Sequence, residues 1–346
     1  MTEFVASAPG KIILFGEHGV HRGQPNITTA VALRTLCRVA VRRDSGYSFA
    51  TGTLREEGSR DRLVAFKAHA DALREANALD EIAALTKDFF VPARYVMATF
   101  AERTDAPGLD VEWRSTLPIG SGLGSGAAAF TSMVLAAARA SSIELSAEDV
   151  ILIAWQGDVI AHGGYGSSLD SSTCTYGGLI SYTLTEKATR LPYDVSLPLV
   201  IGDTLIEHST SKVNTHIRLW LQESHSRMHI FSDMGFLIKQ FMLALEHADL
   251  PTLGHLMNIH QLLQEKMGTS CPESDRLIEA ALAGGALGAK ISGSGLGGII
   301  IALSQPGLQE QVAEAIEAAG GKSYVVQTGA AGVHIDSKEA WSAALA

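Results

Sequence analysis

The stretch "LPIGSGLGSGAAAF", residues 117–130, restricts the possible folds of this chain more than any other segment. It holds four glycines and two serines. Before it, "LDVEWRS" (109–115) alternates apolar and polar residues as a strand does, and after it an alanine-rich run without glycine or proline favours a helix. The sequence therefore predicts a strand, a glycine-rich loop and a helix in succession.

Such a loop can hold an anion. The start of a helix presents unpaired N–H groups and the positive end of the helix dipole, and glycines let an anion approach the main chain closely. The stretch lacks the Gly-Lys-Ser/Thr of a Walker A motif, and Ser125 stands where the dinucleotide fingerprint has its third glycine. Taken alone, it leaves two interpretations open, a phosphate loop and a tight turn without a ligand.

Composition narrows the class of protein. A chain of 346 residues is long enough for one or two domains, and we expect two. With 46% hydrophobic and 18% charged residues it does not resemble a disordered chain, and no apolar run is long enough for a membrane span. The net charge of −10 argues against a nucleic-acid partner bound through a basic face. We therefore expect a soluble protein with neither nucleic acid nor membrane as partner.

The cysteines and the first residues bear on location. Cys37, Cys174 and Cys271 are odd in number and far apart, with neither metal-ligand spacing nor a disulfide framework. The start, "MTEFVASAPGKIILFGEHGV", has no basic leader and does not read as a secretory signal. Both features predict a cytoplasmic protein.

The rest of the chain mixes strands and helices. "KIILF" (11–15) and "CRVAVR" (37–42) have strand character, whereas residues 55–95 carry helical spacing and are expected to form a helical insertion or lid. Ser146 is placed to cap a helix over "SAEDVILIAWQGDVIAHGG". The second half alternates long helices with strands, an α+β pattern, and we place a domain boundary near residue 186.

Two further segments share the character of the glycine stretch: "APGKIILFGEHGV" (8–20) and "GAKISGSGLGG" (288–298). In order and spacing the three segments resemble the signature motifs of the GHMP small-molecule kinases. Within that superfamily the opening "SAPGKIILFGEHGVHRGQP", the stretch "IGDTLIEHSTSKV" and the segment "LMNIHQLL" are similar to those of mevalonate kinases. The resemblance implies an N-terminal ATP-binding domain over 1–185, like ribosomal protein S5 domain 2, and a C-terminal ferredoxin-like domain over 186–346.

The resemblance also implies a reaction: transfer of the γ-phosphoryl group of ATP, with Mg²⁺, to the C5 hydroxyl of (R)-mevalonate, in isoprenoid synthesis. ATP and mevalonate would be the small-molecule partners, and a homodimer is left open. The alternatives are another GHMP enzyme, namely a phosphomevalonate kinase, a mevalonate 3-kinase or decarboxylase, or a sugar kinase. A ligand-sensing pseudokinase without turnover is the alternative of another class.

Phosphorylating an alcohol requires an anion cradle and a group that accepts or orients the hydroxyl proton. By resemblance, Asp170 in "GGYGSSLDSSTCTYGG" is the base and Lys11 of "APGK" lies beside it. The ammonium would keep the carboxylate ionised and stabilise the developing alkoxide. The ATP-binding residues implied by the resemblance are Pro118, Gly120, Gly122, Leu123, Gly124, Ser125, Gly126 and Ala127.

The metal site departs from the family pattern. Relatives have a glutamate eleven residues before the base, but Val159 stands there and Asp158 is one residue earlier. Either a helical shift turns the carboxylate away by about 100°, or the extra residue is absorbed in the loop 164–166 and Asp158 reaches the metal. We favour the second interpretation, with Ser125 as the other ligand. Gly126 replaces a second serine that many relatives carry. The alternative is a solvated acid, with Mg²⁺ held by Ser125, phosphates and water.

For the acceptor the resemblance implies a separate set of residues, which is partly altered here. His208 stands where some relatives have an arginine, and a neutral imidazole lacks the guanidinium fork that binds a carboxylate. Lys212 is placed to compensate. The substrate-binding residues implied are Glu17, His18, Ser209, Thr210, Gly293 and Ser294.

Overall fold

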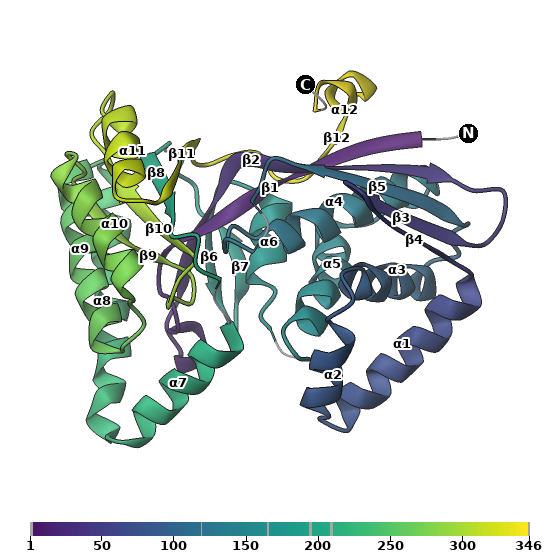
Figure 1. Cartoon of the computed structure of the whole chain (residues 1–346), viewed down its shortest axis with the longest axis horizontal. Helices are drawn as coiled ribbons and strands as arrows, with labels where there is room; N and C mark the ends of the chain where they lie inside the picture. Colours follow the sequence, from purple (N-terminus) through teal and green to yellow (C-terminus); the bar gives the residue numbers. More distant parts are fainter. Residues whose placement is uncertain (1–2, 119, 165, 194–195, 208–209, 345–346) are drawn as a thin grey trace.

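The structure is a computed structural model that describes residues 3–118, 120–164, 166–193, 196–207 and 210–344. Within these residues the chain forms a larger and a smaller β-sheet, each covered by helices, with the larger sheet at the top right of Figure 1. The chain is therefore α+β, as its pattern of strands and helices predicts.

The larger sheet follows the order β12-β1-β2-β5-β3-β4, with β6 on β2 and β7 on β6. Long apolar runs build its centre, because most residues of β1 and of the first part of β2 are buried. Their pairing shifts register between Pro9 and Gly10, which bends the strand beside the glycine loop. The strands are β1 (Glu3–Phe15), β2 (Asn26–Val41), β3 (Tyr47–Thr51), β4 (Leu54–Gly58), β5 (Leu109–Ser115), β6 (Leu179–Thr183), β7 (Lys187–Arg190) and β12 (His334–Asp336).

Helices cover one face of this sheet and lie below it in Figure 1. The helix expected after the glycine loop begins at Ser125 and is buried along most of its length. The helix expected after Ser146 is confirmed too: the Ser146 hydroxyl accepts from the Asp149 N–H, and the Asp149 carboxylate accepts from the Ser146 N–H, which forms a capping box. The helices are α1 (Arg60–Glu75), α2 (Leu79–Leu85), α3 (Val91–Arg103), α4 (Ser125–Ala140), α5 (Ala147–Ala161) and α6 (Leu169–Tyr176), and Val20–Arg22 forms a 3₁₀ turn.

The segment expected to be a helical insertion over 55–95 is only partly helical. Its first residues belong to β4, which pairs with β3, and the helices α1 and α2 follow. The helical spacing is therefore confirmed from Arg60 onward, whereas the charged residues at 55–57 lie on an edge strand, where solvated charges are common.

The smaller sheet has the antiparallel order β11-β8-β10-β9. This is the arrangement of a ferredoxin-like fold, and it confirms the expectation for the C-terminal half. Its strands are β8 (Pro198–Asp203), β9 (Gly288–Ser292), β10 (Ile299–Leu303) and β11 (Lys322–Gln327). Its helices are α7 (Thr210–Gln222), α8 (His229–Glu246), α9 (Leu250–Lys266), α10 (Pro272–Ala283) and α11 (Gln309–Ala318), followed by α12 (Lys338–Ala343) beside β12, while His225–Met228 forms a 3₁₀ turn.

The expected boundary at 185/186 falls inside the turn between β6 and β7. The larger sheet continues to Arg190, the smaller one begins at Pro198, and β12 returns to pair with β1, with Val5 opposite Asp336. We therefore propose to divide the domains between Arg190 and Pro198 and to assign residues 334–336 to the first domain.

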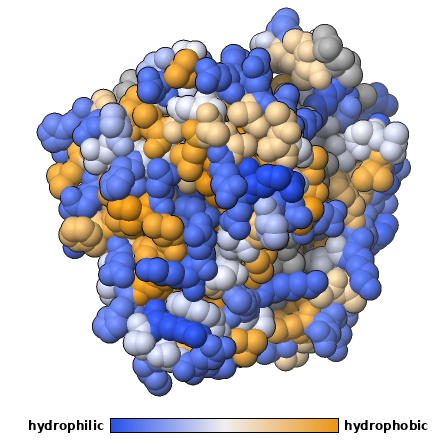
Figure 2. All heavy atoms as spheres, turned by 60° about the vertical axis from the view of Figure 1, so that its left-hand side comes forward, coloured by the Kyte–Doolittle hydropathy of each residue, from blue (hydrophilic) through white to orange (hydrophobic). Residues whose placement is uncertain are grey.

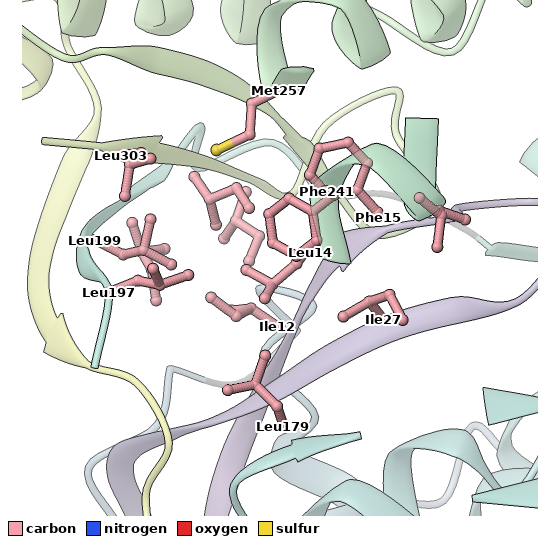
Figure 3. Packing of buried hydrophobic residues seen from close by; sticks show 14 of the residues in the cluster. Ile12, Leu14, Phe15, Ile27, Leu179, Leu197, Leu199, Phe241, Met257 and Leu303 are labelled. Atoms are coloured by element: carbon pink, nitrogen blue, oxygen red, sulfur yellow. The ribbon is translucent and has the colours of Figure 1, made fainter. Parts of the chain in front are cut away.

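A large apolar core joins the two halves, as Figure 3 shows. Phe15 is at the end of β1 and Phe241 is in α8, and their ring centroids are 4.3 Å apart. Burying a side chain of this size stabilises a fold by about 1.5–3 kcal/mol, so the halves are held firmly together at this strand end. The core residues labelled in Figure 3 are Ile12, Leu14, Phe15, Ile27, Leu179, Leu197, Leu199, Phe241, Met257 and Leu303.

On the side of the C-terminal helices, polar and apolar side chains are interspersed over the surface (Figure 2). No helix in the described part of the chain has the length and apolar character needed to cross a bilayer.

Candidate active site

The glycine loop opens α4 without a capping side chain. Gly124 occupies the N-cap position at φ +73°, which glycine adopts without strain. Gly120 and Gly122 also have positive φ, at +76° and +90°. Because no side chain caps this end, the N–H groups of the first turn, at Ser125, Gly126 and Ala127, are oriented toward a ligand position. The loop has the geometry of an anion site.

The loop is fixed against β1. The Lys11 N–H donates to the Leu123 carbonyl at 2.9 Å, and Leu123 is fully buried. The Ser121 hydroxyl donates to the Pro118 carbonyl at 3.1 Å. A Cβ added to Gly124 would lie 2.8 Å from the Lys11 Cγ, so only glycine lets the loop approach the lysine this closely. The first and second glycine motifs therefore meet in space.

Lys11 and Asp170 form an ion pair beside the loop. The lysine Nζ lies 3.1 Å from the aspartate Oδ2, and the side chains are 7% and 32% exposed. Asp170 is in the first turn of α6, where the helix dipole favours a negative charge. The ammonium is thus nearly buried, whereas the carboxylate still reaches the surface from which a substrate would approach.

Asp158 lies in the same cluster and is not a solvated acid. It is 9% exposed, and the Ser171 hydroxyl donates to its Oδ2 at 3.0 Å. Burial, with the nearby Asp170 charge, raises the pKa of Asp158 from 3.8 to about 7. A Cβ on Gly126 would be 3.8 Å from its Oδ1, so the acid faces the start of α4. Of the two placements weighed for this residue, the structure agrees with the one that brings it to the site.

The donors at this place suit Mg²⁺. This ion prefers oxygen ligands and commonly keeps water and phosphate oxygens in its shell. Asp158 offers a carboxylate whose pKa is raised by burial and by the charge of Asp170, and Ser125 starts the adjoining helix. The described residues contain no group of three or more His, Cys, Asp or Glu able to hold a metal by themselves. A cation here would take its other ligands from phosphates and water.

Glu17 has a different environment from the one expected. Its carboxylate is 1% exposed, and its Oε1 accepts from the Lys290 Nζ at 2.5 Å. Its Oε2 lies 3.5 Å from the His260 Nε2, and both partner side chains are fully buried. Burial raises the pKa of Glu17 and lowers those of Lys290 and His260. We therefore withdraw Glu17 from the substrate contacts, because it is enclosed by protein.

His18 connects the first glycine-containing motif, residues 8–20, to the third, residues 288–298. Its backbone is in the left-handed region at φ +63°, and its Nε2 lies 3.0 Å from the Ser294 carbonyl oxygen. Burial lowers the pKa of His18 to about 4, so the ring is neutral at pH 7. Among the described atoms, the Ser294 hydroxyl is buried without a hydrogen-bond partner. His18, Gly293 and Ser294, all expected at the acceptor, are thus neighbours.

The remaining acceptor residues are less defined. Thr210 begins α7, and Lys212, two residues later, is exposed. Ser209, together with His208, lies outside the described residues. The preceding stretch borders the third motif, since the Thr204 hydroxyl donates to the Gly298 carbonyl at 2.8 Å.

A pocket of about 370 Å³ lies where the helical segment meets the loop after α5, and its lining includes none of the predicted site residues. Gly163 and Gly164 line it from the loop that follows Asp158. Across it lie residues of α1 and α2 and of the turn between them, namely Asp71, Arg74, Glu75, Asn77, Leu79 and Ile82. The segment of unassigned role thus forms one wall of this pocket.

Three buried residues of the site were missed by the sequence analysis: Ser171, His260 and Lys290. The only signal for Lys290 was a lysine inside the apolar strand "GAKIS", and for His260 a histidine in a helix resembling the family. Neither Lys290 nor His260 could be paired with Glu17 from the sequence, because Glu17 is more than 200 residues away from both.

Family models match both halves of the chain. The model "GHMP kinases N terminal domain" matches residues 92–178, and "GHMP kinases C terminal" matches residues 241–322. The first match spans the glycine loop, Asp158 and Asp170, and the second spans His260 and Lys290.

Individual proteins are similar over nearly their whole length. The mevalonate kinase of Pyrococcus horikoshii is 33% identical, with 97% of this chain and 99% of that protein covered. Among solved structures, the L. major mevalonate kinase in complex with R-mevalonate has a TM-score of 0.75 at 24% identity, covering 94% of this chain and 96% of that one. The Methanococcus jannaschii mevalonate kinase has a TM-score of 0.78 at 18% identity, covering 93% and 97%. The structural likeness confirms the expected fold.

Proposed function

The chain belongs to the mevalonate kinase family of the GHMP kinases, and on this basis we propose that it transfers the γ-phosphoryl group of ATP to the C5 hydroxyl of (R)-mevalonate. The observation that carries this proposal is the Lys11–Asp170 ion pair, 3.1 Å long, beside an uncapped helix start. The pair provides an acid–base group and a fixed positive charge at the edge of an anion site.

Asp170 is the proposed base. An ionised carboxylate can accept the proton of the attacking hydroxyl or orient that hydroxyl, and the Lys11 ammonium lies 3.1 Å from it. The same ammonium stabilises the negative charge that develops on the alkoxide oxygen. Because Lys11 is nearly buried, its charge is weakly screened by water and acts strongly on both oxygens.

The start of α4 is the proposed phosphate site. The N–H groups of Ser125, Gly126 and Ala127 would donate to the phosphate oxygens of ATP, together with the loop 118–124. Asp158 and Ser125 are the residues that would hold Mg²⁺. When bound, this ion neutralises the charge of the phosphates during transfer.

The acceptor is proposed to lie between the first and third motifs. His18, Gly293 and Ser294 border this position, and Thr210, the first residue of α7, is proposed as a further contact together with Ser209, which lies outside the described residues. The Ser294 hydroxyl, buried and without a partner among the described atoms, is available to a hydroxyl or carboxylate of the substrate.

Product analysis tests the reaction. The purified protein is incubated with ATP, Mg²⁺ and (R)-mevalonate, and the products are identified by mass spectrometry and ³¹P NMR. We expect 5-phosphomevalonate. Recovery of 3-phosphomevalonate or of CO₂ instead would assign the chain to a 3-kinase or a decarboxylase, and turnover of only phosphomevalonate or a sugar would assign it to those kinases.

Asp170→Asn separates an enzyme from a ligand-sensing pseudokinase. In a coupled assay of ADP release we expect the variant to lose about 10²–10⁴-fold in kcat, the range in which a general base contributes. Its affinity for mevalonate should change little. Equal rates for both proteins would remove Asp170 from the mechanism, whereas ligand binding without ADP release by the wild type would indicate a sensor.

A cytoplasmic location and a homodimer complete the proposal. The location is supported by Cys37, Cys174 and Cys271, which form no disulfide in the described structure. The homodimer is tested by the molar mass in solution, measured by light scattering.

A further inference from the structure

A buried charge cluster connects the two domains beside the acceptor site. Glu17 follows β1 of the first domain, whereas Lys290 lies in β9 and His260 in α9 of the second. The Lys290 Nζ donates to the Glu17 Oε1 at 2.5 Å and to the Ile291 carbonyl at 2.5 Å. Both charged side chains are at most 1% exposed.

The cluster also holds the backbone of two glycine turns. The Gly293 N–H, which belongs to the third motif, faces the Glu17 carboxylate and partly offsets the rise in its pKa that burial causes. The Gly16 N–H donates to the His260 Nε2 at 3.3 Å, so this nitrogen is an acceptor and the ring is neutral. One carboxylate and one imidazole therefore connect residues 16 and 17 of the first domain to the second.

The same two segments meet at further points along their length. The Ser292 hydroxyl donates to the Ile13 carbonyl at 2.9 Å and accepts from the Ile13 N–H at 3.0 Å. At the other end, His18 contacts the Ser294 carbonyl at 3.0 Å. Glu17 lies between these contacts, immediately before His18, and Lys290 lies two residues before Ser292 in β9.

A buried ion pair is a poor source of stability. Removing both charges from water costs about as much as their attraction returns, and replacement by apolar residues is often neutral or stabilising. The Glu17–Lys290 pair is instead directional: the Lys290 Nζ donates to both the Glu17 Oε1 and the Ile291 carbonyl, which fixes where the turn at Glu17 lies against β9. Its geometry therefore serves position more than stability.

We propose that Lys290 is a positioning residue for the acceptor: through Glu17 it sets the placement of His18 against Gly293 and Ser294. This inference rests on the proposed function, because the acceptor is taken to be mevalonate. Loss of the pair should displace the acceptor side of the site and leave the phosphate loop, which is built on α4, unchanged.

Lys290→Met, Glu17→Gln and the double variant test the proposal. Met keeps the length and the apolar stem of lysine, and Gln keeps the shape of glutamate. Lys290→Met leaves a buried carboxylate unpaired and should lower the urea midpoint strongly, whereas the double variant should recover most of that loss. Steady-state kinetics should give a KM for mevalonate raised about 10- to 100-fold in both single variants and in the double variant, as for a displacement near 1 Å. The KM for ATP should change little.

The double variant decides between positioning and a structural role. If the pair only stabilised the fold, the double variant would recover its KM for mevalonate along with its urea midpoint, and the proposal would be refuted. An equal rise in both KM values would refute it as well. As matched control, Glu56→Gln disrupts the buried Glu56–Arg94 pair in the first domain, and it should lower the urea midpoint without changing either KM.

The wild type serves as the reference for the proposed function in the same assay. Absence of mevalonate-dependent ADP release by the wild type would refute the proposed function and this inference with it. Normal turnover by the wild type with an unchanged KM for mevalonate in the double variant would refute this inference alone.

Discussion

Replacing Asp158 with asparagine should make the protein without ligands more stable above pH 7. The carboxyl is buried, faces Asp170 and receives a hydrogen bond from the Ser171 hydroxyl. Asparagine has the same shape and can still accept that hydrogen bond, but it carries no charge. The substitution therefore removes the cost of ionising a buried acid and changes little else.

The magnitude follows from the shift in pKa. The folded value of about 7 exceeds the ordinary value of 3.8. With rising pH the unfolded chain releases this proton first, so stability is lost between about pH 4 and pH 7. About three pKa units at 1.36 kcal/mol each give a cost of about 4 kcal/mol at pH 8. At pH 5 the wild type should have lost little more than one third of that amount.

Urea unfolding of both proteins at pH 5 and pH 8, without Mg²⁺ or nucleotide, measures the effect. The midpoint of Asp158→Asn should exceed that of the wild type at pH 8, and the difference should shrink at pH 5. Adding Mg²⁺ and ATP should stabilise the wild type more than the variant, because a bound cation favours the ionised carboxylate.

Asp149→Asn in the same helix is the control. This exposed acid accepts hydrogen bonds from Ser146, which lower its pKa, so its loss should cost about 1 kcal/mol at pH 8 and less in acid. An Asp158→Asn variant that is less stable than the wild type at pH 8, or equally stabilised by Mg²⁺ and ATP, would refute the reasoning.

Three further substitutions test the loop and its neighbours. Lys11→Met should lower kcat about 10²–10³-fold in the ADP-release assay, because it removes the positive charge at Asp170; a kcat within twofold of wild type would contradict this. Gly124→Ala forces a side chain into a backbone at φ +73° and against Lys11, so urea unfolding should show a loss of about 1–2 kcal/mol, and an unchanged midpoint would be evidence against the required glycine. A Cβ at Gly126 would meet no atom closer than 3.5 Å and would lie 3.8 Å from the Asp158 Oδ1, so Gly126→Ser should add a hydroxyl near the proposed cation and lower the Mg²⁺ concentration for half-maximal activity; an increase would place the cation elsewhere.

Local chemistry made several elements predictable. Ser146 and Asp149 predict the start of α5, because their side chains accept hydrogen bonds from the free N–H groups of its first turn. The strand at 109–115 and the helix after the glycine loop follow from alternation and from alanine content, and the structure has both. The pairing of Lys11 with Asp170 was expected from the family resemblance, since 159 positions of sequence separate them and no local pattern connects them.

Long-range burial was not predictable. The resemblance implied that Glu17 binds substrate, but its partner Lys290 in β9 comes from the other end of the chain and the pair is buried. The three-residue strand β12 carries too little pattern to reveal that it returns to β1. Both features depend on how the halves are assembled, which a single sequence does not encode in any short window.

The return of β12 has a mechanical consequence. The chain passes between the domains twice, once between β7 and β8 and again between β11 and β12. Two connections restrict any rotation of one domain against the other to a single axis, namely the line through both connections. The relative orientation of the domains can then vary in one direction only.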